Sequence, residues 1–183
     1  VFQYGSLISL SFLFGIGILI VEVRQRVQMR WIPSFLWLDA DRLVVCEVIV
    51  PSGNWSGAPA HKHDCYIPGK ESNLEEIYYF EVAVSRTASN PRQAAPFGYF
   101  RGFSADDRPY DVTEEVRAGD VALVPYGWHG PTAAGPGYDL YFFNVMAGPD
   151  PERAWNATDH PDQAWIRETW QSQQTDPRLP YGE

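Results

Sequence analysis

Three histidines and one glutamate are the residues whose types and spacing point most directly to chemistry. His61 and His63 are two positions apart, twelve residues separate His63 from Glu76, and His129 follows fifty-three positions after Glu76. On an extended segment, side chains two positions apart point to the same face, so both imidazoles of the His-x-His pair can reach one ion. We therefore predict a mononuclear metal site formed by His61, His63, Glu76 and His129.

The carboxylate of this set is chosen from two neighbouring glutamates. If residues 76–84 form a strand, Glu76 shares its face with Tyr78, whereas Glu75 shares its face with the charged Glu81. A face that carries a tyrosine towards a cavity suits a ligand better than one that carries a second charge. We therefore favour Glu76 as the fourth ligand.

The expected cofactor is one divalent transition metal ion. Imidazole and carboxylate ligands suit zinc, manganese or iron, and also cobalt or nickel, so ligand type alone does not choose the metal. A catalytic site would keep open coordination positions for substrate. A lone histidine is more often structural, and we expect that role for His160, which lacks this context. Cys65 is expected to be a small loop residue rather than a ligand.

Short β-strands must position these side chains. Seven Trp, ten Tyr and ten Phe, together with fifteen Gly and fifteen Pro, favour strands joined by turns over a helical bundle. Apolar and alternating stretches predict strands over residues 21–29, 43–50, 76–84, 97–103, 110–116, 121–125 and 138–146. Residues 164–171 are expected to form a short helix that packs its tryptophans on the strands. The absence of strand–helix alternation predicts an all-β fold, either a closed barrel or a double-sheet jelly roll.

Length, charge and cysteine content narrow the class of protein. A chain of 183 residues suits one domain with a substantial core. The net charge of −9 and the pI near 4.8 argue against nucleic acid and against a polybasic membrane surface as partners. Cys46 and Cys65 form no disulfide framework. We interpret them as free thiols in a reducing compartment, which predicts a cytoplasmic protein.

Residues 1–21 are unusual because they contain no charged side chain. Taken alone, the stretch is long enough to span a bilayer, and the arginines that follow would then place the C-terminal side in the cytoplasm. Ser, Gly and Gln inside the apolar run weaken that interpretation. We favour the alternative that this stretch is a strand remnant of an upstream β domain.

Several runs resemble the 5-deoxyglucuronate isomerase family of inositol catabolism, within the cupin superfamily. The resemblance extends from about residue 21 to the C-terminus and rests on residues 50–56, 59–64, 74–79, 119–129, 144–149, 165–166 and 176–180. It implies a cupin barrel, that is, a double-stranded β-helix or jelly roll, with a short C-terminal extension. Members of the family usually carry two barrels, and here most of the N-terminal half is missing. Trp128 also departs from the family, which more often has Tyr at this position.

The resemblance divides the chain into three parts. Residues 1–37 would be an N-terminal remnant of a truncated half, residues 38–149 the catalytic barrel, and residues 150–183 a tail that packs on the barrel. A homo-oligomer is also compatible with this organisation.

The activity implied is a metal-dependent aldose–ketose isomerisation of a small sugar acid, 5-deoxy-D-glucuronate, to 2-deoxy-5-keto-D-gluconate. Such a reaction needs a base near the substrate, for which Tyr78, Tyr141 and Glu75 are candidates. The substrate carboxylate needs a cation, for which Arg101 and Lys62 are candidates. Because Lys62 alternates away from the two histidines, Arg101 is the stronger candidate.

Three other functions remain open. The first is a related cupin isomerase acting on another sugar acid, such as 5-dehydro-4-deoxyglucuronate, although residues 53–56 argue against it. The second is an iron cupin dioxygenase with the same ligand set. The third is a cupin that binds a sugar without turnover.

Overall fold

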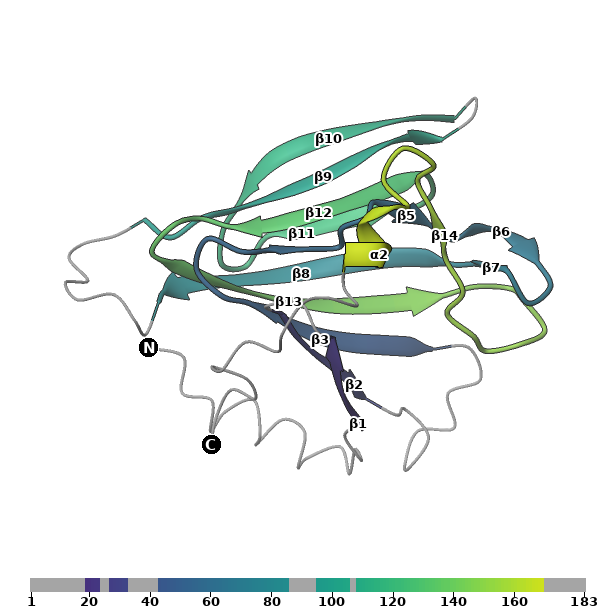
Figure 1. Cartoon of the computed structure of the whole chain (residues 1–183), viewed down its shortest axis with the longest axis horizontal. Helices are drawn as coiled ribbons and strands as arrows, with labels where there is room; N and C mark the ends of the chain where they lie inside the picture. Colours follow the sequence, from purple (N-terminus) through teal and green to yellow (C-terminus); the bar gives the residue numbers. More distant parts are fainter. Residues whose placement is uncertain (1–18, 24–26, 33–42, 86–94, 106–107, 170–183) are drawn as a thin grey trace.

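The protein is built from two facing antiparallel β-sheets, as seen in a computed structural model that describes residues 19–23, 27–32, 43–85, 95–105 and 108–169 (Figure 1). The first sheet has the order β1 (Leu19–Val23), β2 (Val27–Ile32), β3 (Val44–Val50), β13 (Tyr138–Ala147), β8 (Glu75–Val84) and β11 (Val121–Val124). The second has the order β10 (Arg108–Val116), β9 (Gly98–Ala105), β12 (Trp128–Ala134), β5 (His61–Lys62) and β14 (Thr158–Asp159), and β4 (Trp55–Ser56) also pairs with β12.

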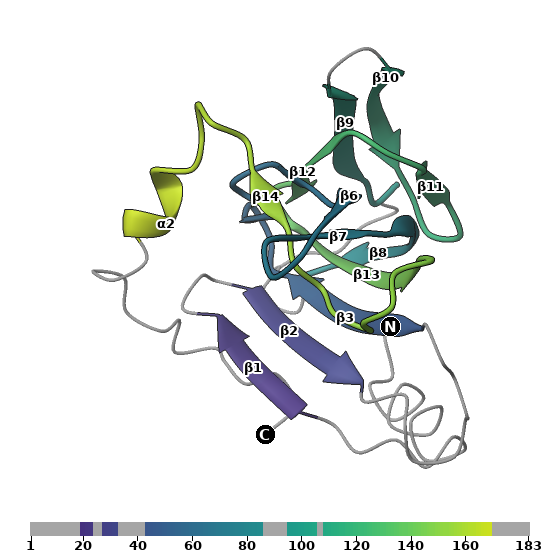
Figure 2. The same ribbon diagram turned by 90° about the vertical axis from the view of Figure 1, so that its right-hand side faces the viewer.

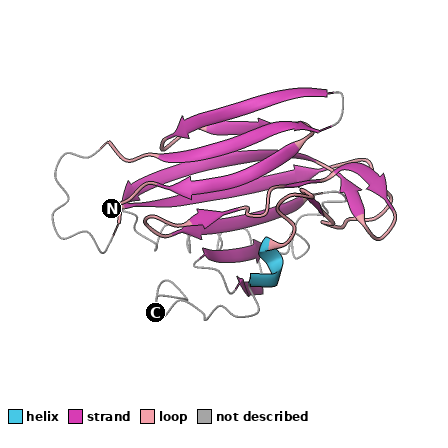
Figure 3. Ribbon diagram, turned by 45° about the horizontal axis from the view of Figure 1, so that its top comes forward, coloured by secondary structure: helices cyan, strands magenta, loops and turns pink. Residues whose placement is uncertain are grey.

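Shorter elements gather at one end of these sheets. The hairpin of β6 (Asp64–Ile67) and β7 (Glu71–Asn73) lies there beside β5 and β14 (Figures 1 and 2). The helix α2 (Ile166–Thr169) follows β14, and the rest of the described chain is strand and loop (Figure 3). The predicted all-β class is therefore confirmed.

The core lies between the two sheets, and the alternation of inward and outward side chains is clearest in β8 and β9, whereas β3 is buried along almost its whole length. In β8, Glu76, Tyr78 and Phe80 are buried while the residues between them are exposed. Phe100 of β9 and Phe142 of β13 meet these side chains, with ring centroids 5.0 Å and 5.2 Å from that of Tyr78. The aromatic content of the sequence thus fills a core in which edge-to-face and tilted contacts add to burial.

The outer face of the first sheet keeps an apolar stripe. Tyr79 pairs with Val121, and Ile77 pairs with Leu123. All four side chains are exposed, from 37% for Tyr79 to 63% for Leu123. Because β11 is the edge strand of this sheet, the stripe lies at its border.

Most predicted strands are present, and the exceptions have physical reasons. The single strand expected over residues 21–29 is instead a pair, β1 and β2, whose register runs from Leu19–Trp31 to Val23–Val27. The sequence contains a sign of this reversal: between the two strands Gln25 is polar where strict alternation would require an apolar residue, and the prediction of one strand overlooked that interruption. The helix near residue 166 exists, but Trp165 is 60% exposed and does not pack on the strands as expected.

The apolar N-terminal stretch is described only in part. Residues 19–21 belong to β1, while residues 1–18 lie outside the described residues. Within the part of the chain that is described, no helix is long and apolar enough to cross a membrane.

Candidate metal centre

Three histidines from neighbouring strands converge at the end of the barrel where β5 lies. His129, in β12, is the direct cross-strand partner of His61, in β5. His63 follows two residues later and turns to the same side. Ligand nitrogens of the three rings lie within 4.8 Å of one another, and all three side chains are buried. The three histidines chosen from the sequence thus form a cluster able to hold a metal ion.

Glu76 faces this cluster from the other sheet. Its Oε2 atom lies 3.0 Å from His63 Nε2 and 3.1 Å from His129 Nε2. Its Oε1 atom accepts a hydrogen bond from the Asn144 amide, which lies one diagonal step away on β13. Because an ionised carboxylate only accepts hydrogen bonds, the Nδ2 group of Asn144, and not its Oδ1 atom, faces Glu76. Glu75, the rejected alternative, is exposed on the outer face.

The hydrogen bonds of the histidines prepare them as ligands. Each Nδ1 atom faces a backbone carbonyl: Pro59 at 3.2 Å for His61, Leu74 at 3.2 Å for His63 and Gly127 at 3.4 Å for His129. A carbonyl can only accept, so each Nδ1 carries the proton and each Nε2 is left as the ligand atom.

The buried donors also fit a metal ion. The Nε2 atom of His129 is buried and has no hydrogen-bond partner within the described residues, despite its proximity to Glu76. His129 Nε2 therefore presents a lone pair, unpaired among the residues that the structure describes, next to two further imidazoles and a carboxylate. Divalent transition metals bind sets of donors of this composition.

The surroundings set the charge of these groups. Burial, helped by repulsion from His129 and His63, lowers the pKa of His61 to about 3, so this imidazole is neutral near pH 7. Burial alone would raise the pKa of Glu76, but the imidazoles of His129 and His63 outweigh it and hold the pKa below its ordinary value. Burial would lower the pKa of His63, but its hydrogen bond to Glu76 raises it above the ordinary value.

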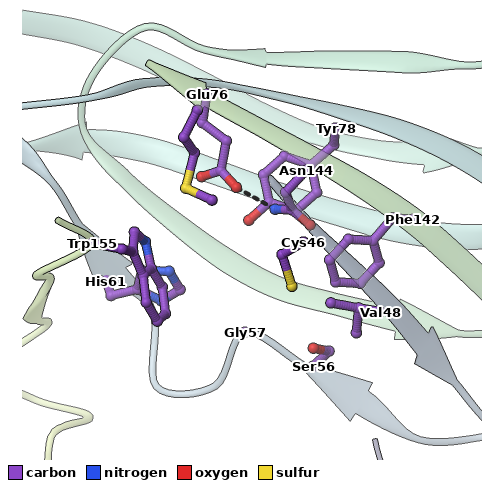
Figure 4. Close-up of a pocket in the computed structure, with 11 residues that line it drawn as sticks. Cys46, Val48, Ser56, Gly57, His61, Glu76, Tyr78, Phe142, Asn144 and Trp155 are labelled. Atoms are coloured by element: carbon purple, nitrogen blue, oxygen red, sulfur yellow. Dashed lines mark hydrogen bonds between the residues drawn. The ribbon is translucent and has the colours of Figure 1, made fainter. Parts of the chain in front are cut away.

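A cavity of about 40 Å³ adjoins the centre (Figure 4). His61, Glu76 and Asn144 form its polar side. The remaining lining residues are Cys46, Val48, Ser56, Gly57, Tyr78, Phe142, Met146 and Trp155. Burial raises the pKa of Tyr78 well above the ordinary value, so its hydroxyl stays protonated near neutral pH. The cavity therefore combines metal-binding groups, one phenol and a largely apolar wall.

The chain after β13 supplies part of this wall. Ser72 Oγ donates to the Ala154 carbonyl at 2.8 Å, and the Ser72 N–H donates to the Asn156 carbonyl at 2.9 Å. These bonds hold Trp155 between them, with its ring edge-on to that of His61 at 5.9 Å (Figure 4). No local sequence pattern pointed to Trp155, because its position depends on contacts with β7, which is distant along the chain.

Other residues expected at the site lie elsewhere. Arg101 is exposed on the outer face of β9, with its guanidinium 4.3 Å from the Phe103 ring centroid. Tyr141 points to the outer side of β13, where its hydroxyl donates to Glu47 Oε1 at 3.0 Å. Both side chains face outward because their neighbours in sequence, such as Phe100 and Phe142, occupy the inward positions of β9 and β13. Of the three catalytic candidates, the structure brings only Tyr78 to the cavity.

Two further residues behave as the sequence suggested. Lys62 points away from the histidines and bonds to Asp64 and Glu71. His160 lies outside the cluster and packs against Phe103 and Trp128. Cys46 and Cys65 are both free thiols, the first buried and the second exposed.

Known proteins resemble this chain in sequence and in structure. A protein from Geobacillus thermodenitrificans named 5-deoxy-glucuronate isomerase is 45% identical over 130 residues, which cover 71% of this chain and 43% of that protein. A protein of the same name from Listeria monocytogenes is 41% identical over 129 residues, which cover 70% and 42%. This chain thus spans less than half the length of these curated relatives.

The crystal structure of an IolB-like protein from Salmonella typhimurium LT2 matches with a TM-score of 0.63 and 38% identity, covering 83% of this chain and 53% of that one. The cupin fold expected from the sequence is confirmed. Residues 25–166 match the KduI/IolB family. Because this match spans 142 of its 183 residues, the chain belongs to the KduI/IolB family.

Proposed function

We propose that this chain is a metal-dependent isomerase that converts 5-deoxy-D-glucuronate to 2-deoxy-5-keto-D-gluconate, a step of myo-inositol catabolism in the cytoplasm. The observation that carries the proposal is the cluster of His61, His63 and His129 in a chain 45% identical to a 5-deoxy-glucuronate isomerase. We assign Glu76 as the fourth ligand, because its carboxylate faces two of the three imidazoles.

The residues of the site have distinct proposed roles. A divalent metal held by His61, His63, Glu76 and His129 would polarise the carbonyl and hydroxyl oxygens of the substrate and stabilise the charge that develops on them. Tyr78 lines the cavity and keeps the proton on its Oη atom, so it could donate a hydrogen bond to a bound substrate. Trp155 covers one side of the cavity and limits the access of water to the reacting atoms.

The proposal is tested with the purified chain alone, because it spans less than half the length of its relatives. The chain is loaded in turn with zinc, manganese or iron, its metal content is measured, and 5-deoxyglucuronate is followed by NMR in deuterium oxide. We expect the ketose product with deuterium incorporated from the solvent. Because metal catalysis contributes several kcal/mol, His61→Ala and His129→Ala should each lower the rate about a hundredfold or more.

The matched control is His160→Ala, which removes a histidine outside the cluster and should leave the rate unchanged. A folded, metal-loaded chain that converts no substrate would contradict the proposal. Consumption of oxygen by the iron-loaded chain would instead favour a dioxygenase.

A further inference from the structure

A buried group of charged side chains lies behind the strand that carries His61 and His63. Lys62, between the two histidines, points the opposite way. Its Nζ atom is 2.8 Å from Asp64 Oδ1 and 2.7 Å from Glu71 Oε1. The two carboxylate side chains are only 4% and 1% exposed. Buried carboxylates of this kind persist only when their oxygens are paired, so their partners are structurally significant.

The second oxygen of Asp64 reaches the segment that carries His129. Asp64 Oδ2 accepts the Gly127 N–H at 2.9 Å and a hydrogen bond from Arg108 Nη2 at 2.6 Å. The carbonyl of the same Gly127 accepts from His129 Nδ1. One carboxylate, in the residue after His63, therefore binds the residue whose carbonyl orients His129.

The regular pairing of β12 with its neighbours is short around His129. The pairing of β12 with β5 has a single register position, His129 with His61. Trp128 and His129 pair with Phe103 and Gly102 of β9, and the register then shifts before Thr132. Because only two paired positions separate the turn at Gly127 from this irregularity, a side-chain bond to the turn helps to determine where the imidazole lies.

We propose that Asp64 is a positioning residue of the metal centre, which holds His129 in place through the turn at Gly127. Lys62 donates to the Asp64 carboxylate, and Glu71 accepts from Lys62 and from the Asp64 backbone N–H, so the two residues hold Asp64 in the orientation that this bond needs. The inference rests on the metal centre proposed above. Partners that orient a metal ligand typically account for about 10–100-fold in metal affinity.

The test measures the affinity of the metal-free chain for Co²⁺ by titration, with the visible absorption of the bound ion as the signal and no activity assay. We expect Asp64→Ala to weaken Co²⁺ binding about 10–100-fold. Asp64→Asn, which keeps one oxygen for the Gly127 N–H, should lose less. Glu115→Ala is the control, because it removes an exposed ion pair with Arg117 on β10, and it should bind Co²⁺ as the wild type does.

Double-mutant cycles separate positioning from general destabilisation. If Asp64 acts through His129, adding Asp64→Ala to a chain that already carries His129→Ala should not weaken Co²⁺ binding further. Adding Asp64→Ala to a chain that carries His63→Ala should weaken Co²⁺ binding as much as it does in the wild type. Equal costs in both backgrounds, or wild-type affinity of Asp64→Ala, would overturn the proposal. If Asp64→Ala does not fold, the same cycles with Asp64→Asn decide by the same criterion.

Failure of the wild type to bind Co²⁺ would overturn the metal centre and this inference together, whereas a Co²⁺-binding chain without isomerase activity would contradict only the proposed reaction.

Discussion

Asn144 fixes the direction in which Glu76 presents its carboxylate to the histidines. Its amide holds Oε1, which leaves Oε2 directed at His63 and His129. In Asn144→Leu, Oε1 would be buried without a donor and the carboxylate would be free to rotate. We expect affinity for Co²⁺ to fall about 10–100-fold, measured by titration of the metal-free protein.

Val145→Thr is the matched control for that substitution. Val145 is the next residue of β13 and points to the opposite face of the sheet. It should bind Co²⁺ normally. Wild-type affinity in Asn144→Leu would show that Glu76 needs no such support.

His61 makes the stability of the metal-free protein depend on pH. Its folded pKa of about 3 lies below the ordinary value of 6.5, so between these values the unfolded chain binds the extra proton. The contribution of His61 to the free energy of unfolding is therefore fully present above pH 6.5 and is lost as the pH falls towards 3. The free energy of unfolding falls by at most about 1.4 kcal/mol per pH unit from this group.

Urea denaturation of the metal-free protein at pH 7.5, 6.5 and 5.5 measures this dependence. The free energy of unfolding should fall less steeply with acid in His61→Gln than in the wild type, and His160→Gln should follow the wild type. Because the raised pKa of His63 acts in the opposite direction, the difference between variants is the informative quantity. Identical slopes in wild type and His61→Gln would contradict the assignment.

At this scale the sequence predicted which histidines cluster better than it predicted the groups around them. The His-x-His spacing and the alternation around Glu76 fix side-chain direction locally, without knowledge of the fold. Arg101 and Tyr141 lie on the outer faces of their strands, since both alternate with residues that fill the core, and their role at the site stays a prediction. Trp155 depends on tertiary bonds to Ser72, which no local pattern encodes.

At the scale of elements, the approach of β12 to the chain before β5 depends on a glycine. Gly130 has φ +98°, and a Cβ atom there would lie 2.1 Å from the carbonyl oxygen of Gly57. Gly137 has a similar φ of +87°, yet nothing lies within 4 Å of its Cβ position. The two positions therefore separate the cost of backbone strain from the cost of crowding.

We expect Gly137→Ala to lower the free energy of unfolding by about 1–2 kcal/mol, the cost of a left-handed conformation. Gly130→Ala should lose about 1–3 kcal/mol more, because the Gly57 backbone must move. Since Gly130 follows His129, Gly130→Ala should also weaken Co²⁺ binding. Urea denaturation and metal titration measure the two effects, and equal losses at both positions would show that the contact with Gly57 is not restrictive.

Strands with a clear apolar or alternating pattern were predictable from sequence, whereas β12 and the two-residue strands were not. β3, β8 and β13 carry enough apolar or alternating residues to define a strand by themselves. β12 contains Gly130-Pro131, which is typical of a turn, and its strand conformation depends on its neighbours. The two-residue strands β5 and β14 exist only as partners of other strands.

At the scale of the whole molecule, the division at residues 37/38 and 149/150 stays a prediction. β2 pairs with β3 over five positions across the first boundary, and β14 pairs with β5 across the second. The three proposed parts would thus be joined by sheet hydrogen bonds as well as by the chain itself. The His61–Asp159 pairing in particular places the tail directly against a ligand strand.

The apolar stripe of Ile77, Tyr79, Val121 and Leu123 has a consequence for concentrated solutions. At pH 7 the net charge of −9 keeps the molecules apart by mutual repulsion. Near the pI of about 4.8 that repulsion vanishes, while the stripe beside the edge strand β11 remains exposed. Edge strands with apolar side chains associate readily once charge no longer opposes it. We therefore expect the protein to precipitate near this pH, with light scattering as the measurement.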